Sequence, residues 1–264
     1  MTRRYPMLLV ALVAAVLLVP FVPDIDLTTT LADATVALTD TAGGVGLAPL
    51  AALGVALVVT RRGIDWRQRS RETVALGVVL TVALVGGALM NEFVVKPAFD
   101  VPRPNIEQLA TSGVLGPEIN DGAAFYASGD KADRRLLLAA TLSEDTVPFV
   151  SANVRAHWIH EAGHSFPSGH ATAAMSFAAV LGAAGVAWLT GWRRVVALWL
   201  VPLWAVAVVY SRPLLEVHTP VDVIAGTISG LLIGIVSFSL VRRLVADSSS
   251  AEITVDATTE GQGE

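Results

Sequence analysis

The sequence predicts an all-α integral membrane protein: a bundle of six transmembrane helices with one long helical extracytoplasmic loop. Of its 264 residues, 53% are hydrophobic and only 16% are charged, whereas a soluble domain carries about a quarter charged residues. Six apolar stretches approach the roughly 20 residues that cross a bilayer. Basic residues also gather at alternate ends of these stretches. The composition therefore excludes an ordinary cytosolic enzyme.

The six expected spans follow one another along the chain with few polar interruptions. They cover about residues 6–22, 42–60, 73–95, 168–189, 195–210 and 221–241. The first follows Arg3 and Arg4, as a signal peptide would, but no clear small-residue cleavage site comes after it, so we expect an uncleaved helix. The fifth is short, and the flanking Arg193 and Arg194 can reach the interface to complete it.

The positions of the basic residues predict the orientation. Eleven of the 18 lie in short segments at one set of helix ends: Arg3, Arg4, Arg61, Arg62, Arg67, Arg69, Arg71, Arg193, Arg194, Arg242 and Arg243. By the positive-inside rule these segments, and with them both termini, are cytoplasmic. Residues 23–41, 96–167 and 211–220 then lie outside. The loop 96–167 has helix-compatible patches near 131–143 and 147–160, and loops of this length are usually functional.

We expect one membrane domain, residues 1–243, followed by an acidic tail, residues 244–264. The tail holds five acidic residues and no Lys or Arg, and without it the chain carries 18 basic and 18 acidic residues. Its Ser, Thr, Gly and acidic composition is typical of a disordered segment, which the topology places in the cytoplasm. The net charge of −5 therefore belongs to the tail, and we expect no nucleic-acid partner.

The end of the third span carries two basic residues. Lys96 is the last residue of the expected helix, and Pro97, Pro102 and Pro104 follow it. Three prolines prevent the helix from continuing, so we expect Lys96 and Arg103 on an extended or turning arm. Taken alone, they would be an interfacial lysine and a solvent-exposed arginine.

The fourth span opens with Pro167-Ser168-Gly169-His170. Ser168 is a favourable N-cap, and Gly169 leaves the backbone N–H groups of the first turn unobstructed. Free N–H groups at a helix N-terminus form an anion site, and His170 would point at the same anion. Taken alone, this pattern is also explained by simple capping.

The sixth span begins after His218. Thr219 as N-cap, Pro220 at the first helical position and Asp222 two residues later form a start signal close to a capping box. Asp222 lies one turn after His218 and can reach its imidazole, which would fix the tautomer and raise the basicity of the other ring nitrogen. Taken alone, Asp222 would only cap the helix.

These motifs are stronger evidence for a site together than each is alone, because the positive-inside rule places all the helix ends that carry them on one side of the membrane. The cations from these ends are Lys96, Arg103 and Arg212. Arginine guanidiniums suit forked recognition of phosphate oxygens. Two histidines, a paired carboxylate and three cations could therefore surround one anion.

We expect no metal and no cofactor. The cluster is cationic and lacks the several oxygen ligands that magnesium prefers. The absence of cysteine excludes disulfides, zinc–thiolate sites and a thiolate nucleophile. His157, His160 and His164 have spacings found among zinc ligands, but Glu161 is the one carboxylate nearby.

The three motifs read K-x6-R-P at Lys96 to Pro104, P-S-G-H at Pro167 to His170, and S-R-x5-H-x3-D at Ser211 to Asp222. Together they resemble the signature of the type 2 phosphatidic acid phosphatase (PAP2) superfamily, which also includes vanadium haloperoxidases. Order and spacing match over residues 96–222. Phe125-Tyr126, residues 154–158 and the stretch from Glu161 to His170 also resemble the loop of its bacterial phosphatidylglycerophosphatase B and undecaprenyl-diphosphate phosphatase branch.

The resemblance implies a metal-independent phosphatase of lipid phosphates in a bacterial plasma membrane. His218 would be the nucleophile that forms a phosphohistidine, Asp222 would orient it, and His170 would protonate the leaving oxygen and then activate water. The residues implied to hold the phosphoryl oxygens are Lys96, Arg103, Ser168, Gly169 and Arg212. The candidates for headgroup contacts are Glu161 and Arg155.

The implied partners are the bilayer and a lipid phosphate: phosphatidylglycerophosphate, undecaprenyl diphosphate, phosphatidate or diacylglycerol diphosphate. Transfer of the phosphate to another lipid or to a sugar is an alternative, because an alcohol can capture a phosphohistidine. A haloperoxidase is disfavoured because those relatives are soluble. A non-catalytic anion binder or transporter needs cations but no acid and nucleophile pair. No pattern in the sequence selects an oligomeric state.

Overall fold

The computed structural model describes residues 4–260, and the side chains of residues 5–246. Within this range the chain is helical and contains no strand. The first half contains α1 (Arg4–Val16), η1 (Val19–Phe21), α2 (Thr30–Asp40), α3 (Gly44–Val59), α4 (Trp66–Thr81), η2 (Val82–Gly86), α5 (Gly87–Met90), η3 (Asn91–Val95), α6 (Lys96–Phe99) and α7 (Pro104–Thr111). The second half contains α8 (Gly122–Ala127), α9 (Lys131–Thr141), α10 (Ala152–His160), α11 (Gly169–Ala187), α12 (Gly191–Val195), η4 (Val196–Leu200), α13 (Val201–Leu214) and α14 (Pro220–Glu260).

Within the described part of the chain, four helical stretches are long and apolar enough to cross a membrane. They are Trp66–Phe99, Gly169–Ala187, Gly191–Leu214 and Pro220–Ala246. They correspond to the third to sixth predicted spans, so the chain is a membrane protein of the expected all-α class. The second predicted span corresponds to α3, which forms a pair with α2 bent by 62°, and the first to the shorter apolar helix Tyr5–Phe21. The count of six spans therefore stays a prediction.

The helix that carries Lys96 is longer than the prolines predict. It does not stop at Lys96 but continues through α6 to Phe99, and it ends where Asp100 adopts a left-handed backbone with φ of 49°. Pro97 lies in the first turn of α6, directly after the π-helical turn η3. A proline is tolerated in a first turn, where its missing N–H is not needed. The predicted extended arm therefore begins after Phe99 and includes Arg103 but not Lys96.

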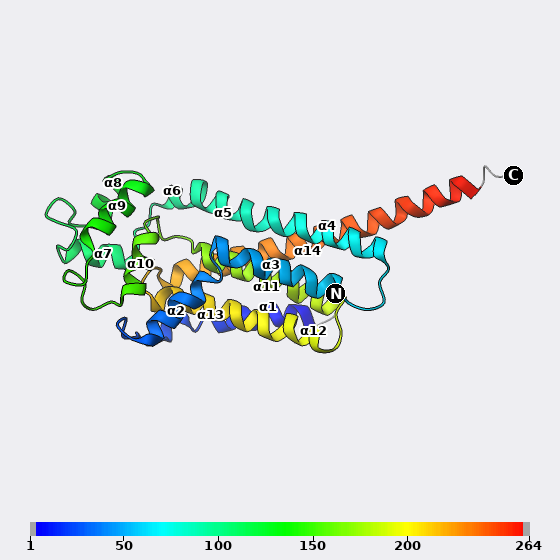
Figure 1. Ribbon diagram of the computed structural model, residues 1–264, viewed down its shortest axis with the longest axis horizontal. Helices are drawn as coiled ribbons and strands as arrows, with labels where there is room; N and C mark the ends of the chain where they lie inside the picture. The colour runs from blue at the N-terminus through cyan, green and yellow to red at the C-terminus, as the bar shows by residue number, and fades with distance from the viewer. Residues whose placement is uncertain (1–3, 261–264) are drawn as a thin grey trace.

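A helical cap, made of α7–α10 and the segments between them, covers one end of the bundle (Figure 1). Its apolar core includes Ile106, Phe125, Leu138 and Trp158 and continues into the α13–α14 connection. The indole Nε1 of Trp158 donates to the carbonyl of Leu215 at 2.8 Å. The cap therefore holds in place the short connection that carries His218.

The basic segments lie at the opposite end of the bundle. Figure 1 shows α12 and the α3–α4 turn there, far from the cap. Arg61 in that turn lies over the ring of Trp188, and Trp188 packs on Phe238 of α14. The segments that the positive-inside rule assigns to the cytoplasm therefore lie away from the cap, and the orientation itself stays a prediction.

The acidic tail begins inside α14. Its helical backbone runs on to Glu260 and extends beyond the bundle (Figure 1), while residues 261–264, like residues 1–3, lie outside the described range. The disorder of residues 244–264 stays a prediction.

Glycines on α14 bring it very close to the central helix α11. Gly226, Gly230 and Gly234 recur every four residues, so they form one stripe along the helix. A Cβ atom at Gly226 would come within 2.5 Å of the Ser168 carbonyl oxygen, and one at Gly234 within 2.5 Å of the Cβ of Ala179. Small residues let membrane helices approach closely where there is no hydrophobic force between them. The stripe therefore fixes how near the N-termini of α11 and α14 lie.

We predict that Gly234→Ala destabilises the protein, because the added methyl group would overlap α11. Overpacking of this kind costs about 1–3 kcal/mol, so the thermal unfolding midpoint of the purified protein in detergent should fall. Gly86→Ala is the matched control, because a Cβ atom there meets no atom within 4 Å and alanine is the better helix former. An equal midpoint for both variants would contradict the close contact.

Candidate active site

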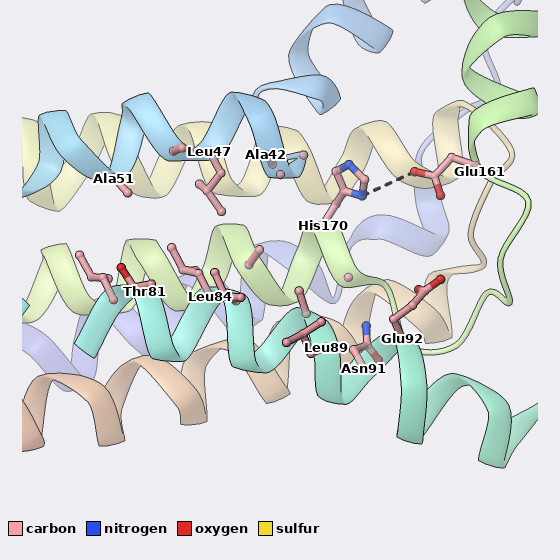
Figure 2. A pocket seen from close by; sticks show the side chains of 18 of the residues that line it. Ala42, Leu47, Ala51, Thr81, Leu84, Leu89, Asn91, Glu92, Glu161 and His170 are labelled. Carbon is pink, nitrogen blue, oxygen red and sulfur yellow. Dashed lines mark ion pairs between the residues drawn. The ribbon is translucent and has the colours of Figure 1, made fainter. Parts of the chain in front are cut away.

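One cavity connects the motifs with an apolar wall. It has a volume of about 770 Å³ and lies between α3, the α4–α6 helix, the start of α11 and the cap. Its charged, imidazole and amide side chains are Asn91, Glu92, Lys96, Arg103, Lys131, Arg135, His160, Glu161, His170 and His218. Away from them, the wall is formed by apolar side chains such as Leu47, Ala51 and Leu84 (Figure 2). The cavity could therefore hold a molecule with one charged and one apolar part.

His218 lies in the connection before α14 and is buried. Its Nε2 lies 3.2 Å from a guanidinium nitrogen of Arg103, and its Nδ1 lies 3.1 Å from the hydroxyl of Ser165. Because a guanidinium can only donate, Nε2 accepts and the ring proton is assigned to Nδ1. Burial, followed by the charge of Arg103, lowers the pKa of His218. Its imidazole is therefore neutral at neutral pH, with a lone pair on Nε2.

Ser165 lies between His218 and Asp222. The direct distance from His218 Nδ1 to Asp222 Oδ2 is 3.6 Å, too long for a hydrogen bond. The Ser165 hydroxyl donates to that same carboxylate oxygen at 2.7 Å, and the backbone N–H of Thr219 also donates to it at 2.7 Å. The expected pair of histidine and aspartate is thus bridged by a serine. Sequence reasoning missed Ser165, and no local pattern marks it.

The start of α11 differs from the expected serine cap. Ser168 is at the N-cap position, but its hydroxyl makes no capping hydrogen bond, so that part of the prediction is wrong. The backbone instead ties two helix starts together, because the Ser168 N–H donates to the carbonyl of Asp222 at 3.0 Å. Among the described side chains, the buried Ser168 hydroxyl has no hydrogen-bond partner. It remains free to bind a ligand.

Two buried arginines come from opposite sides of the site. Arg103 precedes α7 and donates from Nε to the carbonyl of Gly163 at 2.7 Å and from Nη1 to that of Val217 at 2.9 Å. Arg212, near the end of α13, donates from Nη1 to the hydroxyl of Thr39 at 2.8 Å. These contacts leave the Nη2 atoms of both arginines directed toward the same carboxylate.

That carboxylate belongs to Glu161, which follows α10. It accepts from Arg103 Nη2 at 2.5 Å on one oxygen and from Arg212 Nη2 at 2.8 Å on the other. Burial disfavours the charged form, but Arg103 and Arg212 outweigh it and hold the pKa of Glu161 well below its usual range. His170 Nδ1 lies 3.7 Å from the same carboxylate, and Figure 2 shows the two side chains facing each other.

Lys96 lines the cavity but is paired within its own helix. Its ammonium donates to Glu92 at 3.1 Å. Lys131 of the cap binds the other oxygen of Glu92. Asn91, beside Glu92 on the same helix in Figure 2, donates from its side-chain amide to the carbonyl of Pro167 at 3.3 Å. The α4–α6 helix is therefore linked to both the cap and the motif before α11.

The three histidines with zinc-like spacing do not converge on one point. His157 accepts from Arg212 at 3.1 Å, His160 lies 3.4 Å from Arg135, and His164 pairs with Asp100 at 2.6 Å. Among the described residues, no three His, Cys, Asp or Glu side chains are grouped so that they could hold a metal ion. Arg155 of α10 is not among the residues that line the cavity.

The chain is similar to known proteins over about two thirds of its length. The family model of the PAP2 superfamily matches residues 73–246. Phosphatidylglycerophosphatase B of Escherichia coli (strain K12) is 28% identical over 178 residues, which cover 67% of this chain and 65% of that protein. Phosphatidylglycerophosphatase B of Haemophilus influenzae is 29% identical over 171 residues, 64% of each chain. The matched region spans slightly less than two thirds of the length of these relatives. The family match includes all three motifs and more than half of the chain, and the chain therefore belongs to the PAP2 superfamily.

Proposed function

We propose that the protein is a phosphatase that removes a terminal phosphate from a membrane lipid. One observation carries the proposal: His218, His170 and the buried Arg103 line the polar end of a cavity whose other wall is apolar. A second buried arginine, Arg212, is joined to this end by the Glu161 carboxylate, which binds both arginines. A lipid phosphate has the same division between a charged and an apolar part. A simple anion binder would need the arginines but not the histidines.

In the first step, His218 Nε2 attacks phosphorus, and the bond from phosphorus to the lipid oxygen breaks. His170, protonated at this point, gives its proton to the departing oxygen and becomes neutral, and a phosphohistidine remains on His218. In the second step, His170 takes a proton from water, whose oxygen attacks phosphorus, and the bond from phosphorus to nitrogen breaks. Ser165 and Asp222 hold the Nδ1–H of His218 throughout and stabilise the positive charge that the ring gains.

The cations stabilise the charge of the phosphoryl group in the transition state. Phosphoryl transfer depends mainly on in-line positioning and on electrostatic stabilisation. The groups assigned to the phosphoryl oxygens are Arg103, Arg212, Lys96, the Ser168 hydroxyl and the backbone N–H of Gly169. With this much fixed positive charge at the site, we expect the reaction to proceed without a divalent metal.

The lipid chains would lie along the apolar wall of α3, the α4–α6 helix and α11. The matched relatives are named for phosphatidylglycerophosphate, which is therefore the first substrate to test, with undecaprenyl diphosphate, phosphatidate and diacylglycerol diphosphate beside it. The positive-inside rule places the cap and the site on the outer face of a bacterial plasma membrane, and both termini in the cytoplasm. Arg155 has no part in this proposal.

We predict that the purified protein releases phosphate from these lipids in detergent, with chelator present and no added acceptor. His218→Ala should lower the rate by roughly a thousandfold or more, because the nucleophile is lost. Arg155→Ala should keep normal activity. Full activity of His218→Ala would contradict the mechanism, loss of activity in chelator would contradict the metal-free step, and a requirement for an acceptor would indicate phosphotransfer.

We predict that Ser165→Ala lowers kcat by about 10–100-fold and changes KM little, because the hydroxyl positions His218 without touching substrate. Ser165→Thr keeps the hydroxyl and should recover part of kcat. A merely structural role would instead lower the folded fraction of both variants without a selective effect on kcat. Thermal unfolding measured beside the kinetics separates the two cases.

The orientation predicts that a reporter fused after Glu264 is active only in the cytoplasm. An alkaline phosphatase fusion, which needs the oxidising exterior to form its disulfides, should be inactive at this position. A fusion placed within the cap, between α8 and α9, is the matched positive control. An active fusion after Glu264 would reverse the proposed orientation.

A further inference from the structure

The two buried arginines bind a carboxylate of the protein itself. Glu161 bridges Arg103 and Arg212 with one oxygen on each, and all three side chains are buried. Arg103 is 1% exposed and Arg212 is fully buried. Two buried guanidiniums without a counter-charge would strongly destabilise the folded protein. Glu161 therefore supplies the negative charge that these arginines need when no substrate is bound.

The site contains more hydrogen-bond donors than Glu161 satisfies. Among the described side chains, Arg212 Nε and the Ser168 hydroxyl are buried and have no hydrogen-bond partner. Buried polar groups nearly always have one. A carboxylate offers two oxygens, whereas a terminal phosphoryl group offers three. The donor set therefore fits an anion with more oxygens than Glu161 supplies.

A phosphoryl group and the Glu161 carboxylate cannot share the arginines in this arrangement. Both would need the Nη2 groups of Arg103 and Arg212, so the two anions would lie within a few ångströms of each other in a buried pocket. Like charges at that distance repel strongly where water does not screen them. Binding of one must displace the other.

We propose that Glu161 is an internal competitor for the phosphate site: it occupies Arg103 and Arg212 in the free protein, and the phosphoryl group of the substrate takes its place. This inference rests on the proposed function and adds a determinant of specificity to it. A ligand must bring enough charge to replace a carboxylate on two arginines. A doubly charged terminal phosphate meets this condition better than a singly charged phosphodiester headgroup.

The exchange also affects the nucleophile. Arg103 binds Glu161 through Nη2 and donates from Nη1 to Nε2 of His218, so in the free protein it covers the lone pair that would attack phosphorus. When a phosphoryl group replaces Glu161, the guanidinium turns toward the new oxygens and uncovers Nε2. The nucleophile would thus be exposed only when a phosphate is present.

The opposite reading is that Glu161 is a scaffold that holds the arginines in position for phosphate. The two readings predict opposite signs when the carboxylate is removed. If Glu161 competes, phosphate binds more tightly to the variant. If Glu161 is a scaffold, the arginines lose their orientation and phosphate binds more weakly.

The test is isothermal titration of inorganic phosphate into the purified full chain in detergent. Glu161→Gln keeps the shape of the side chain and removes its charge, and we expect it to bind phosphate about tenfold more tightly or better than the wild type. Glu161→Asp keeps the charge but is one methylene shorter and reaches two guanidiniums poorly. Its affinity for phosphate should therefore lie between those of the wild type and of Glu161→Gln. If Glu161→Gln does not fold, Glu161→Asp against the wild type decides the question.

Glu72→Gln is the matched control. Glu72 is also buried and bound to an arginine, Arg61, at 2.5 and 2.6 Å, but at the opposite end of the bundle. Removing the charge of Glu72 should leave the affinity for phosphate unchanged. Equal or weaker binding by Glu161→Gln, or no phosphate binding by any of the proteins, would overturn the proposal.

The phosphate-binding measurement does not depend on whether the protein hydrolyses a lipid. If Glu161→Gln binds phosphate more tightly while the wild type releases no phosphate from any of the four lipids, the proposed function fails and the competitor stands. If the wild type is active but the affinities do not rise in the expected order, the function stands and the competitor fails.

Discussion

The close contact between α11 and α14 determines the geometry of the whole site. The histidines of two motifs lie at the beginnings of these helices, and the Ser168 N–H donates directly to the carbonyl of Asp222. Gly226, next to this bond, leaves no room for a side chain. Because the helices are rigid and cross the membrane together, their separation sets the distance between His170 and His218. A glycine without a side chain thus controls how close the starts of the two helices lie.

The second constraint is electrostatic and comes from the cap. Arg103 and Arg212 are buried, so each needs acceptors for its donors and a negative charge nearby. The cap and its adjoining segments supply most of these: the carbonyls of Gly163 and Val217 for Arg103, and the carboxylate of Glu161 for both. The segment that follows α10 also holds Ser165, whose hydroxyl contacts His218. The loop between α10 and α11 is therefore part of the site, and the cap stabilises the reacting groups as well as covering them.

The parts of the molecule that were predictable depend on local rules. Thr219 and Asp222 form the expected start of α14, because the Thr219 N–H donates to Asp222 and the Asp222 N–H to Thr219. Long runs of apolar residues likewise identified the four long helices. Lys96 was misplaced because proline rules describe regular α-helices, whereas a π-helical turn precedes Pro97. Local rules fail where an unusual turn changes the hydrogen-bond pattern.

The contacts that escaped prediction are those created by tertiary folding. Arg134 lies in a stretch that also holds Asp130 and Asp133, a composition typical of an exposed helix face, yet it is buried and donates to the carbonyls of Ala162 and Gly129. Ser165 and Glu161 carry no helix or capping signal, and they reach the site because the cap folds back over the bundle. A buried arginine donates to the acceptors that lie near it in the folded protein, and a single sequence does not show which residues those are. This explains why the motif residues could be predicted to gather at one end of the bundle, while the ion pairs of Glu161, which the sequence marked only as a candidate headgroup contact, required the structure.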